Sequence, residues 1–237
     1  MVVRGLAPSR ARARDLIQRG FVKVDGRACL KPSTSVSASQ SVELANNAPG
    51  YVSRGAEKLI AALDAFHFSA AGRVALDVGA STGGFTQVLL ERGATRVYAV
   101  DVGHSQLSPS LGADPRVVSL EGTDARALDA IRVPEPIGAI VADVSFISLA
   151  KALPAALALA APAAWLVALI KPQFEAGPGH VGRGGIVREA AVQQRAVREV
   201  RTWMAGQDGW SVAGVVPSPI PGGSGNAEFL IGATFSG

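Results

Sequence analysis

The sequence contains very little cysteine and histidine. Cys29 is its only cysteine, so the chain cannot form an intramolecular disulfide, which suits a reducing cytoplasm. Its three histidines, His67, His104 and His180, are scattered and do not make a zinc cluster with a single cysteine. The first ten residues also lack the apolar core of a signal peptide. We therefore expect a cytoplasmic protein without a bound metal.

The one hydrophobic stretch long enough to span a membrane is interrupted by proline. Residues 152–170 are uncharged and have about the length of a membrane-spanning helix. However, they are rich in alanine, and Pro154 and Pro162 break the run. We predict a helix over about 148–160, then a buried strand over 164–170, and no membrane partner; a spanning segment is the alternative.

Basic charge is concentrated in the first part of the chain. Residues 1–31 hold eight basic and two acidic side chains, a net +6, and since the formal total is +4, the other 206 residues carry a net −2. This asymmetry indicates an acidic partner, first of all nucleic acid, although a solvated basic face would have the same composition. The residues that we expect to contact RNA are Arg4, Arg10, Arg12, Arg19, Lys23, Lys31, Arg54 and Arg183.

The N-terminal part predicts a small α+β module. Ser9 can cap a helix that runs to about Gln18, and the Asp25-Gly26 pair favours a two-residue hairpin turn. One further strand is expected over residues 42–44, followed by a linker rich in Asn and Pro. We place a first domain and linker at residues 1–48 and a second domain at residues 49–237.

The second domain alternates strands with helices. Nearly continuous apolar strands argue for a parallel sheet covered on both faces, an α/β fold. The expected strands are 73–79, 96–102, 116–122, 139–145 and 164–171, with two closing strands after residue 210. The expected helices are 53–66, 82–93, 124–130, 148–160 and 188–206.

Polar residues end or follow five successive strands of this domain. They are Asp77, Asp101, Asp124, Asp143 and Lys171. Ligands of open parallel sheets lie beyond the carboxyl ends of the strands, so these side chains are expected to share one site. Any one acid could be a helix cap, but five in succession favour a functional edge. Lys171 is the least expected of them, because six apolar residues precede it.

The loop after Asp77 reads "DVGASTGGF" (77–85). It lacks the G-x-G-x-x-G spacing of dinucleotide sites and the lysine of a P-loop. A glycine loop followed by the strand-terminal acid Asp101 fits a nucleoside ligand without a pyrophosphate, which describes S-adenosylmethionine. The predicted cofactor-binding residues are Asp77, Gly79, Ser81, Thr82, Gly83, Gly84, Phe85, Asp101, Val102, Asp124, Ala125 and Asp143.

Six segments together resemble the haemolysin-A/TlyA family of rRNA 2′-O-methyltransferases, whose catalytic domain is similar to the FtsJ-type fold. They are "VSRGAEKL" (52–59), "LDVGASTGGFTQVLL" (76–90), "VYAVDVGHSQL" (97–107), "DVSFISL" (143–149), "LIKPQFEAG" (169–177) and "GNAEFL" (225–230). The resemblance implies a Rossmann-like methyltransferase sheet of seven strands with the last antiparallel. Residues 4–33 likewise resemble an RNA-binding module named after a small-subunit ribosomal protein, which in the family usually begins a few residues earlier.

The resemblance also implies a catalytic tetrad of Lys58, Asp143, Lys171 and Glu228. Lys171 would be the base or the group that orients a ribose 2′-hydroxyl, and Asp143 would bridge it to S-adenosylmethionine. Lys58 and Glu228 would position the nucleotide. The implied substrate is a cytidine of ribosomal RNA, presented as RNA or as a ribosomal subunit. Residues 173–189, with five glycines, would be a lid over the RNA or a plain flexible connection.

Four other functions are alternatives to this one. A membrane-active haemolysin would need a spanning segment, and the one candidate contains prolines. A pyrimidine carbon-5 methyltransferase needs a nucleophilic cysteine, but Cys29 lies in the other domain. An amine methyltransferase typically has Asn-Pro-Pro-aromatic where this chain reads "DVSF". A non-enzymatic RNA-binding protein would not need acids at the strand ends.

Overall fold

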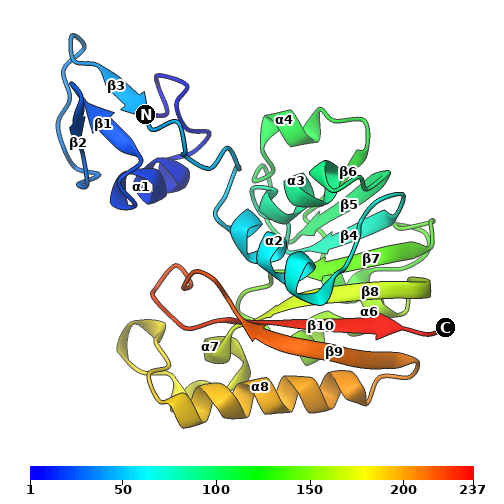
Figure 1. The fold of residues 1–237 in the computed structure, drawn as a ribbon. Coiled ribbons are helices and arrows are strands. Elements are labelled where there is room, and N and C mark those ends of the chain that lie inside the picture. Colours follow the sequence, from blue (N-terminus) through cyan, green and yellow to red (C-terminus); the bar gives the residue numbers. More distant parts are fainter. The chain divides into compact units, whose positions relative to one another are not determined.

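The chain folds into two compact units, Met1–Arg54 and Gly55–Gly237. The structure is a computed structural model that describes residues 1–237 except for the side chain of Pro178. Each unit has its own sheet (Figure 1). The boundary expected after residue 48 lies in the irregular segment between the two sheets.

The N-terminal unit packs one helix against a three-stranded antiparallel sheet of order β2-β1-β3. Its elements are α1 (Arg10–Gln18), β1 (Val22–Val24), β2 (Arg27–Ala28) and β3 (Val42–Leu44). Ser9 caps α1 by accepting a hydrogen bond from the backbone N–H of Arg12, and Asp25 and Gly26 both take positive φ in the hairpin turn. The predicted cap, turn and third strand are therefore confirmed.

The C-terminal unit is built on a seven-stranded sheet of order β6-β5-β4-β7-β8-β10-β9. Its strands are β4 (Val74–Val78), β5 (Arg96–Asp101), β6 (Val117–Glu121), β7 (Ile137–Ala142), β8 (Ala160–Ile170), β9 (Trp210–Pro217) and β10 (Phe229–Phe235). β10 runs antiparallel to the other six strands, which confirms the expected Rossmann-like sheet.

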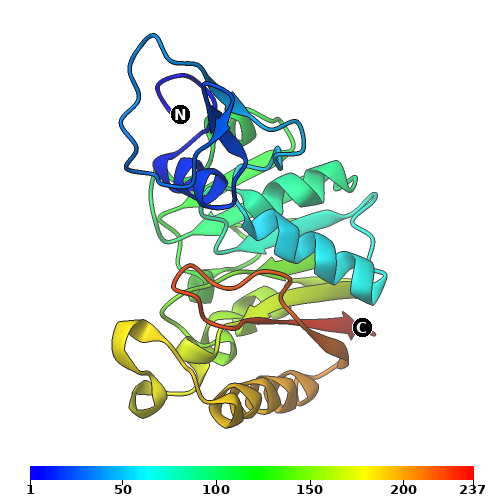
Figure 2. The same cartoon turned by 60° about the vertical axis from the view of Figure 1, so that its left-hand side comes forward.

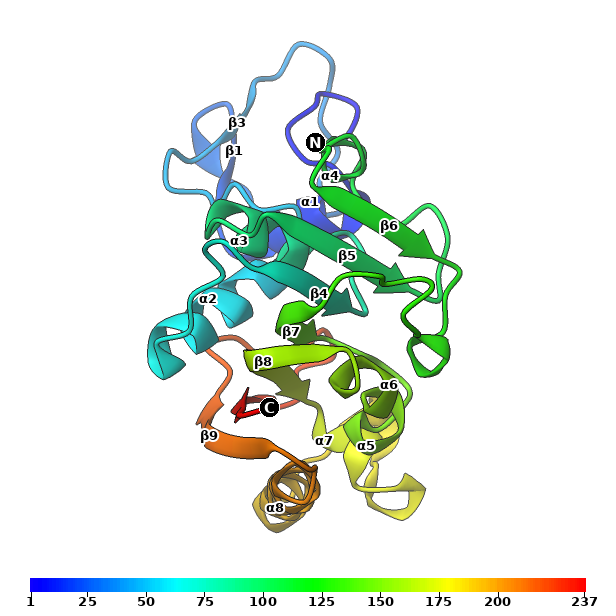
Figure 3. The same cartoon turned by 90° about the vertical axis from the view of Figure 1, so that its right-hand side faces the viewer.

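Helices cover both faces of this sheet (Figures 2 and 3). One face carries α2 (Gly55–Phe66) and α3 (Gly84–Glu91), and the other carries α5 (Leu149–Ala152), α6 (Pro154–Leu157) and α8 (Ala190–Ala205). Two short helices follow strand ends, α4 (Pro109–Gly112) after β5 and α7 (Pro172–Glu175) directly after β8. The 3₁₀ turns are η1 (Ala125–Ala127), η2 (Pro178–His180) and η3 (Arg183–Gly185).

Two expected helices are wrong in extent. The helix predicted over 124–130 is reduced to the 3₁₀ turn η1, because the Asp129 carboxylate accepts the backbone N–H groups of Ile131 and Arg132 and so competes with helical bonding. The stretch predicted over 148–160 is divided into α5 and α6 at Pro154, which has no N–H to donate.

The apolar run 152–170 forms α6 and the buried strand β8 rather than one long helix. The strand begins four residues earlier than expected, and a register shift against β7 accommodates Pro162 and the positive φ of Ala163. Among the described residues, no helix is both long and apolar enough to cross a membrane.

Candidate active site

The topology brings three carboxylates to one edge of the sheet. After β4 the chain continues to β5 and β6 on one side, then returns to place β7 and β8 on the other, so β4 and β7 flank the switch point. Asp77 lies in β4, Asp101 ends β5 and Asp143 directly follows β7. The carboxyl ends of parallel strands meet at this edge, where doubly wound folds bind ligands.

Lys171 and Asp143 form an ion pair at this edge. The Lys171 Nζ lies 2.6 Å from Asp143 Oδ1 and donates a hydrogen bond of 3.0 Å to Ser145 Oγ. Ala142 of β7 lies beside Ala168 of β8, and Asp143 and Lys171 directly follow the ends of these two neighbouring strands. The lysine side chain is 11% exposed, and its ammonium lies 5.9 Å from the centre of the Phe174 ring. The Lys171 ammonium is therefore mostly buried but still reaches the surface at the carboxyl edge of the sheet.

Lys58 and Glu228 form a second, more deeply buried pair, 2.5 Å from Nζ to Oε2. Their side chains are only 6% and 3% exposed. Phe229 pairs with Ile170 across the antiparallel β10–β8 ladder, which places Glu228 beside Lys171 in sequence register. A Cβ at Gly222 would collide with the Glu228 carboxylate, so a glycine there lets its loop close over the pair. The four residues of the implied tetrad thus converge on one edge.

Asp77 is fully buried with half of its carboxylate unpartnered. Thr86 Oγ1 donates a 2.6 Å hydrogen bond to Oδ2, while Oδ1 has no hydrogen-bond partner among the described residues. Burial, reinforced by the charges of Asp143 and Asp101 and opposed by Thr86, raises the pKa of Asp77 to about 7. An unsatisfied buried carboxylate near two further acids fits a cationic ligand, such as the ammonium and sulfonium of S-adenosylmethionine.

The glycine loop is held against the ends of the neighbouring strands. Gly79 takes φ +84°, and a Cβ there would lie 2.6 Å from the Asp143 carbonyl oxygen. Asp101 accepts hydrogen bonds from the backbone N–H groups of Ser81 (2.8 Å) and Gly103 (2.7 Å). Asp101 therefore ties the glycine loop to the loop after β5, as an anchor for both.

The remaining predicted cofactor residues surround this loop. Gly83 caps α3, Gly84 and Phe85 open that helix and are buried, the Thr82 carbonyl accepts from Ser108 N–H, and Val102 is 69% exposed just after β5.

Asp124 and Ala125 lie farther along, at η1. Asp124 caps that turn and pairs with Arg126, whose guanidinium hydrogen bonds chiefly lower the pKa of Asp124 to about 2. An adenine amino group would have to compete with Arg126 for this carboxylate.

Sequence reasoning missed Glu121, which ends β6. Its carboxylate accepts the backbone N–H groups of Ser105, Gln106 and Leu107, and these bonds lower the pKa of Glu121. Glu121 thus shapes the loop that follows Asp101. The available signal was its position as the last residue of an apolar strand, the same signal that identified Asp101.

Comparison with known proteins assigns the chain to a family. The FtsJ-like methyltransferase family pattern matches residues 51–235, and the S4 domain pattern matches residues 1–42. The 16S/23S rRNA (cytidine-2′-O)-methyltransferase TlyA of Mycobacterium tuberculosis is 50% identical over 236 residues, 98% of this chain and 86% of that protein. The chain belongs to the TlyA family of FtsJ-like methyltransferases.

Other relatives agree with this assignment. Hemolysin A of Brachyspira hyodysenteriae is 39% identical over 95% of this chain and 94% of its own. A solved structure from Streptococcus thermophilus, of a protein classed by name with the hemolysins, shows 39% identity and a TM-score of 0.80 over 98% of this chain and 84% of that chain. The TlyA family thus carries both methyltransferase and hemolysin names.

The S4 unit of this TlyA-family chain presents most of its basic residues to solvent, but Arg12 is buried. Arg12 is only 3% exposed, and its guanidinium donates to Asp15 Oδ2 (2.7 Å) and to the Pro49 carbonyl (2.5 Å). This side chain fastens α1 to the segment after β3, and the expected contact of Arg12 with RNA stays a prediction. No pattern in the residues around Arg12 indicates that burial.

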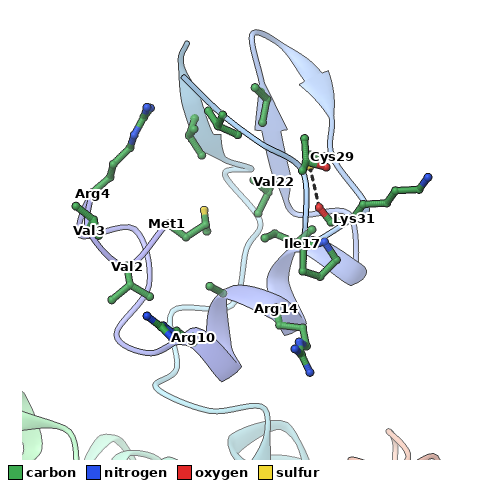
Figure 4. A pocket seen from close by; sticks show the side chains of 16 residues that line it. Met1, Val2, Val3, Arg4, Arg10, Arg14, Ile17, Val22, Cys29 and Lys31 are labelled. Carbon is green, nitrogen blue, oxygen red and sulfur yellow. Dashed lines mark hydrogen bonds between the residues drawn. The ribbon is translucent and has the colours of Figure 1, made fainter. Parts of the chain in front are cut away.

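The exposed cations gather around a pocket of about 550 Å³ in the S4 unit (Figure 4). Arg4, Arg10, Arg14 and Lys31 are among its lining residues, together with the apolar side chains of Ile17 and Val22 and others. Arg4 also donates to the carbonyls of Gln40 and Ser37. Arg19 lies over the Phe21 ring, and Lys23 is exposed on β1. In the other predicted positions, Arg54 is half-buried and Arg183 is exposed.

Proposed function

We propose that this chain transfers a methyl group from S-adenosylmethionine to a ribose 2′-hydroxyl of ribosomal RNA, at a cytidine. The observation that carries the proposal is the Lys171–Asp143 ion pair at the switch point of a methyltransferase sheet. A lysine held there by a carboxylate can grip a hydroxyl beside the cofactor crevice. The name of the 50% identical relative, a cytidine-2′-O-methyltransferase of 16S and 23S rRNA, supports the substrate class.

The cofactor would lie against the glycine loop. When bound, S-adenosylmethionine supplies an electrophilic methyl group on a positively charged sulfur. Asp77 would provide the buried negative charge for its cationic end, and Asp101 would accept from its ribose hydroxyls while keeping Ser81 and Gly103 in place. A carboxylate has about four lone-pair sites, so Asp101 can serve both sets of donors.

Lys171 would act on the substrate hydroxyl. A lysine ammonium has three N–H donors, and in this structure two of its polar contacts are Asp143 and Ser145. We assign the remaining direction to the 2′-oxygen, which Lys171 would orient by donating a hydrogen bond; as a base it would have to be the neutral amine, whose lone pair takes the hydroxyl proton as the methyl group arrives. Because the reaction is a direct displacement, holding the oxygen in line accounts for much of the rate.

Lys58 and Glu228 would position the nucleotide. Their mutual pairing makes each the charge partner of the other in a buried setting, so neither side chain can be removed without leaving an unpaired buried charge. This pair would keep the position of Glu228, and hence the start of β10, fixed relative to Lys171.

The S4 unit would supply RNA affinity through its exposed cations. Arginine and lysine contacts to phosphates release counterions and make binding strongly dependent on salt. The expected partners are ribosomal RNA and ribosomal subunits, and the pocket rim of Arg4, Arg10, Arg14 and Lys31 is where we place the first contacts.

The proposal is tested with radiolabelled S-adenosylmethionine and unmodified ribosomal subunits or naked rRNA. We expect label in an alkali-resistant dinucleotide, lost in Lys171→Ala and retained in Lys151→Ala, an exposed lysine of α5. Label in an alkali-sensitive methylated base would instead indicate base chemistry. Cofactor binding without transfer to any of these RNAs would count against the substrate, and RNA binding without cofactor binding would favour a non-enzymatic RNA-binding protein.

A further inference from the structure

Asn226 is a buried polar residue that the proposed chemistry does not use. It is 2% exposed and lies two residues before Glu228. Its side-chain oxygen accepts a 2.9 Å hydrogen bond from the backbone N–H of Val187, and its amide nitrogen donates a 2.8 Å bond to the Gly185 carbonyl. Asn226 therefore satisfies both ends of its carboxamide on a segment about forty residues earlier.

Val187 is also held from the other side. The Gln193 side chain donates a 2.8 Å hydrogen bond to the Val187 carbonyl, so both backbone polar atoms of this residue bond to side-chain amides. The Val187 side chain is 2% exposed and packs with Ala176 and Val192 in a small cluster separate from the main core. Such a fully satisfied point is a fixed anchor for the chain around it.

The anchor supports a short basic loop, residues 181–188, which we call the Arg183 segment. It lies between α7 and α8 in Figure 1. Gly184 and Gly185 both have positive φ, and Gly182 N–H bonds to the Ile186 carbonyl, which closes a tight turn. Arg183 and Arg188 are exposed on it. Arg183 and Arg188 therefore face solvent from a turn whose backbone Asn226 holds in place.

The geometry points to Asn226 as a positioning residue for RNA, an inference that rests on the proposed function. Asn226 fixes the Arg183 segment against the loop that carries Glu228, so that Arg183 and Arg188 hold phosphates beside the target ribose. Phosphate contacts set the register of a nucleic acid on its protein, and small displacements at a reacting centre slow the reaction markedly. The two hydrogen bonds of Asn226 give these arginines a fixed relation to the catalytic edge.

The expected effect falls on RNA recognition. In Asn226→Ala, both amide bonds to the segment are lost, and we expect the KM for rRNA to rise about tenfold with kcat at saturating RNA and cofactor affinity unchanged. Gln193→Ala loosens Val187 without touching the Glu228 loop and should give a smaller change of the same kind. Gln207→Ala removes a comparable bond, to the Trp203 carbonyl at the far end of α8, and should change nothing.

Coupling to the arginines gives a sharper test. Arg183→Ala should raise KM in the wild-type background, but add little in Asn226→Ala, because the segment is already displaced. Full additivity of the two changes would overturn the inference, and so would a fall in kcat with KM unchanged, which would mean that Asn226 acts through Glu228 alone.

A second measurement needs no methylation. Trypsin should cleave after Arg183 faster in Asn226→Ala and Gln193→Ala than in the wild type or Gln207→Ala. Equal cleavage rates would overturn the inference that Asn226 holds the Arg183 segment, even if the enzyme is active. If the wild-type chain methylates no rRNA while cleavage is accelerated in Asn226→Ala and Gln193→Ala, the proposed function fails, but the hold of Asn226 on the Arg183 segment stands.

Discussion

Replacing Asp77 by asparagine removes the one fully buried carboxyl whose pKa lies near neutrality. Its folded-state pKa, raised by burial to about 7, exceeds its ordinary value of 3.8. The protonated form therefore stabilises the fold fully below the unfolded pKa, and this contribution is lost as the pH rises through about 7. From these two values the wild-type chain should lose about 2 kcal/mol of unfolding free energy from this group between pH 5.5 and pH 8.

The assay is denaturant unfolding at several pH values, followed by tryptophan fluorescence. All three tryptophans, Trp165, Trp203 and Trp210, lie in the methyltransferase unit, so the signal reports that unit. The difference in unfolding free energy between Asp77→Asn and wild type should move in favour of the variant by about 2 kcal/mol over that range. Asp208→Asn, at an exposed position of the same unit, serves as the matched control.

The same carboxyl should make cofactor affinity depend on pH. If a cationic ligand binds only ionised Asp77, affinity rises about tenfold from pH 6 to pH 8, because the ionised fraction rises by that factor around a pKa of about 7. Asp77→Asn should bind weakly and without this dependence. An equal pH dependence of stability in wild type and variant would refute the burial argument. A flat affinity in the wild type would remove Asp77 from the cofactor site.

Two further changes follow from the contacts. Glu228→Gln leaves Lys58 buried without its carboxylate, so we expect the unfolding free energy to fall by about 3 kcal/mol and methyl transfer to be lost. The double variant with Lys58→Met should recover stability but not activity. A double-mutant cycle of unfolding measures this coupling, and additive changes would contradict the pairing. Arg12→Ala should destabilise the S4 unit, because this side chain is buried. Arg14→Ala, two residues along on the exposed face, should instead weaken RNA binding and its salt dependence without changing stability. Thermal unfolding and filter binding separate the two effects, and an equal loss of affinity at full stability in Arg12→Ala would contradict its structural role.

The sequence predicted the edge better than the loops around it. Strand periodicity located the ends of β4, β5 and β8, and the carboxyl ends of parallel strands necessarily meet, so the neighbourhood of Asp77, Asp101 and Lys171 could be expected before any coordinates. Lys58 and Glu228 lie 170 residues apart, so only the family resemblance placed them in one site, and their direct pairing was not predicted.

Local capping interactions were the main source of error. Nothing in the spacing "ALDAIRVP" (127–134) distinguishes a helix from the turn that the Asp129 carboxylate makes with Ile131 and Arg132. Arg12 was similarly indistinguishable from its exposed neighbours, since its burial depends on the Pro49 carbonyl, far along the chain. Side chains that bond to distant backbone are set by the tertiary fold.

The structure also separates acids that the sequence treats alike. Asp101 is anchored by two backbone amides, Asp124 by Arg126 and Asp143 by Lys171, so each has partners within the protein. Asp77 is bonded only by Thr86, through its hydroxyl and its backbone, and its second oxygen is buried without a hydrogen bond.

An anchored acid can accept further hydrogen bonds without needing a counter-charge, which suits the neutral hydroxyls of a ribose. A buried acid without a cation near it is stabilised in its ionised form only when a ligand brings positive charge. In the function proposed above, the two kinds of carboxylate would therefore match the two ends of S-adenosylmethionine, its neutral sugar at Asp101 and its cationic methionine end at Asp77. On this argument Asp77 is the acid whose protonation should control cofactor binding.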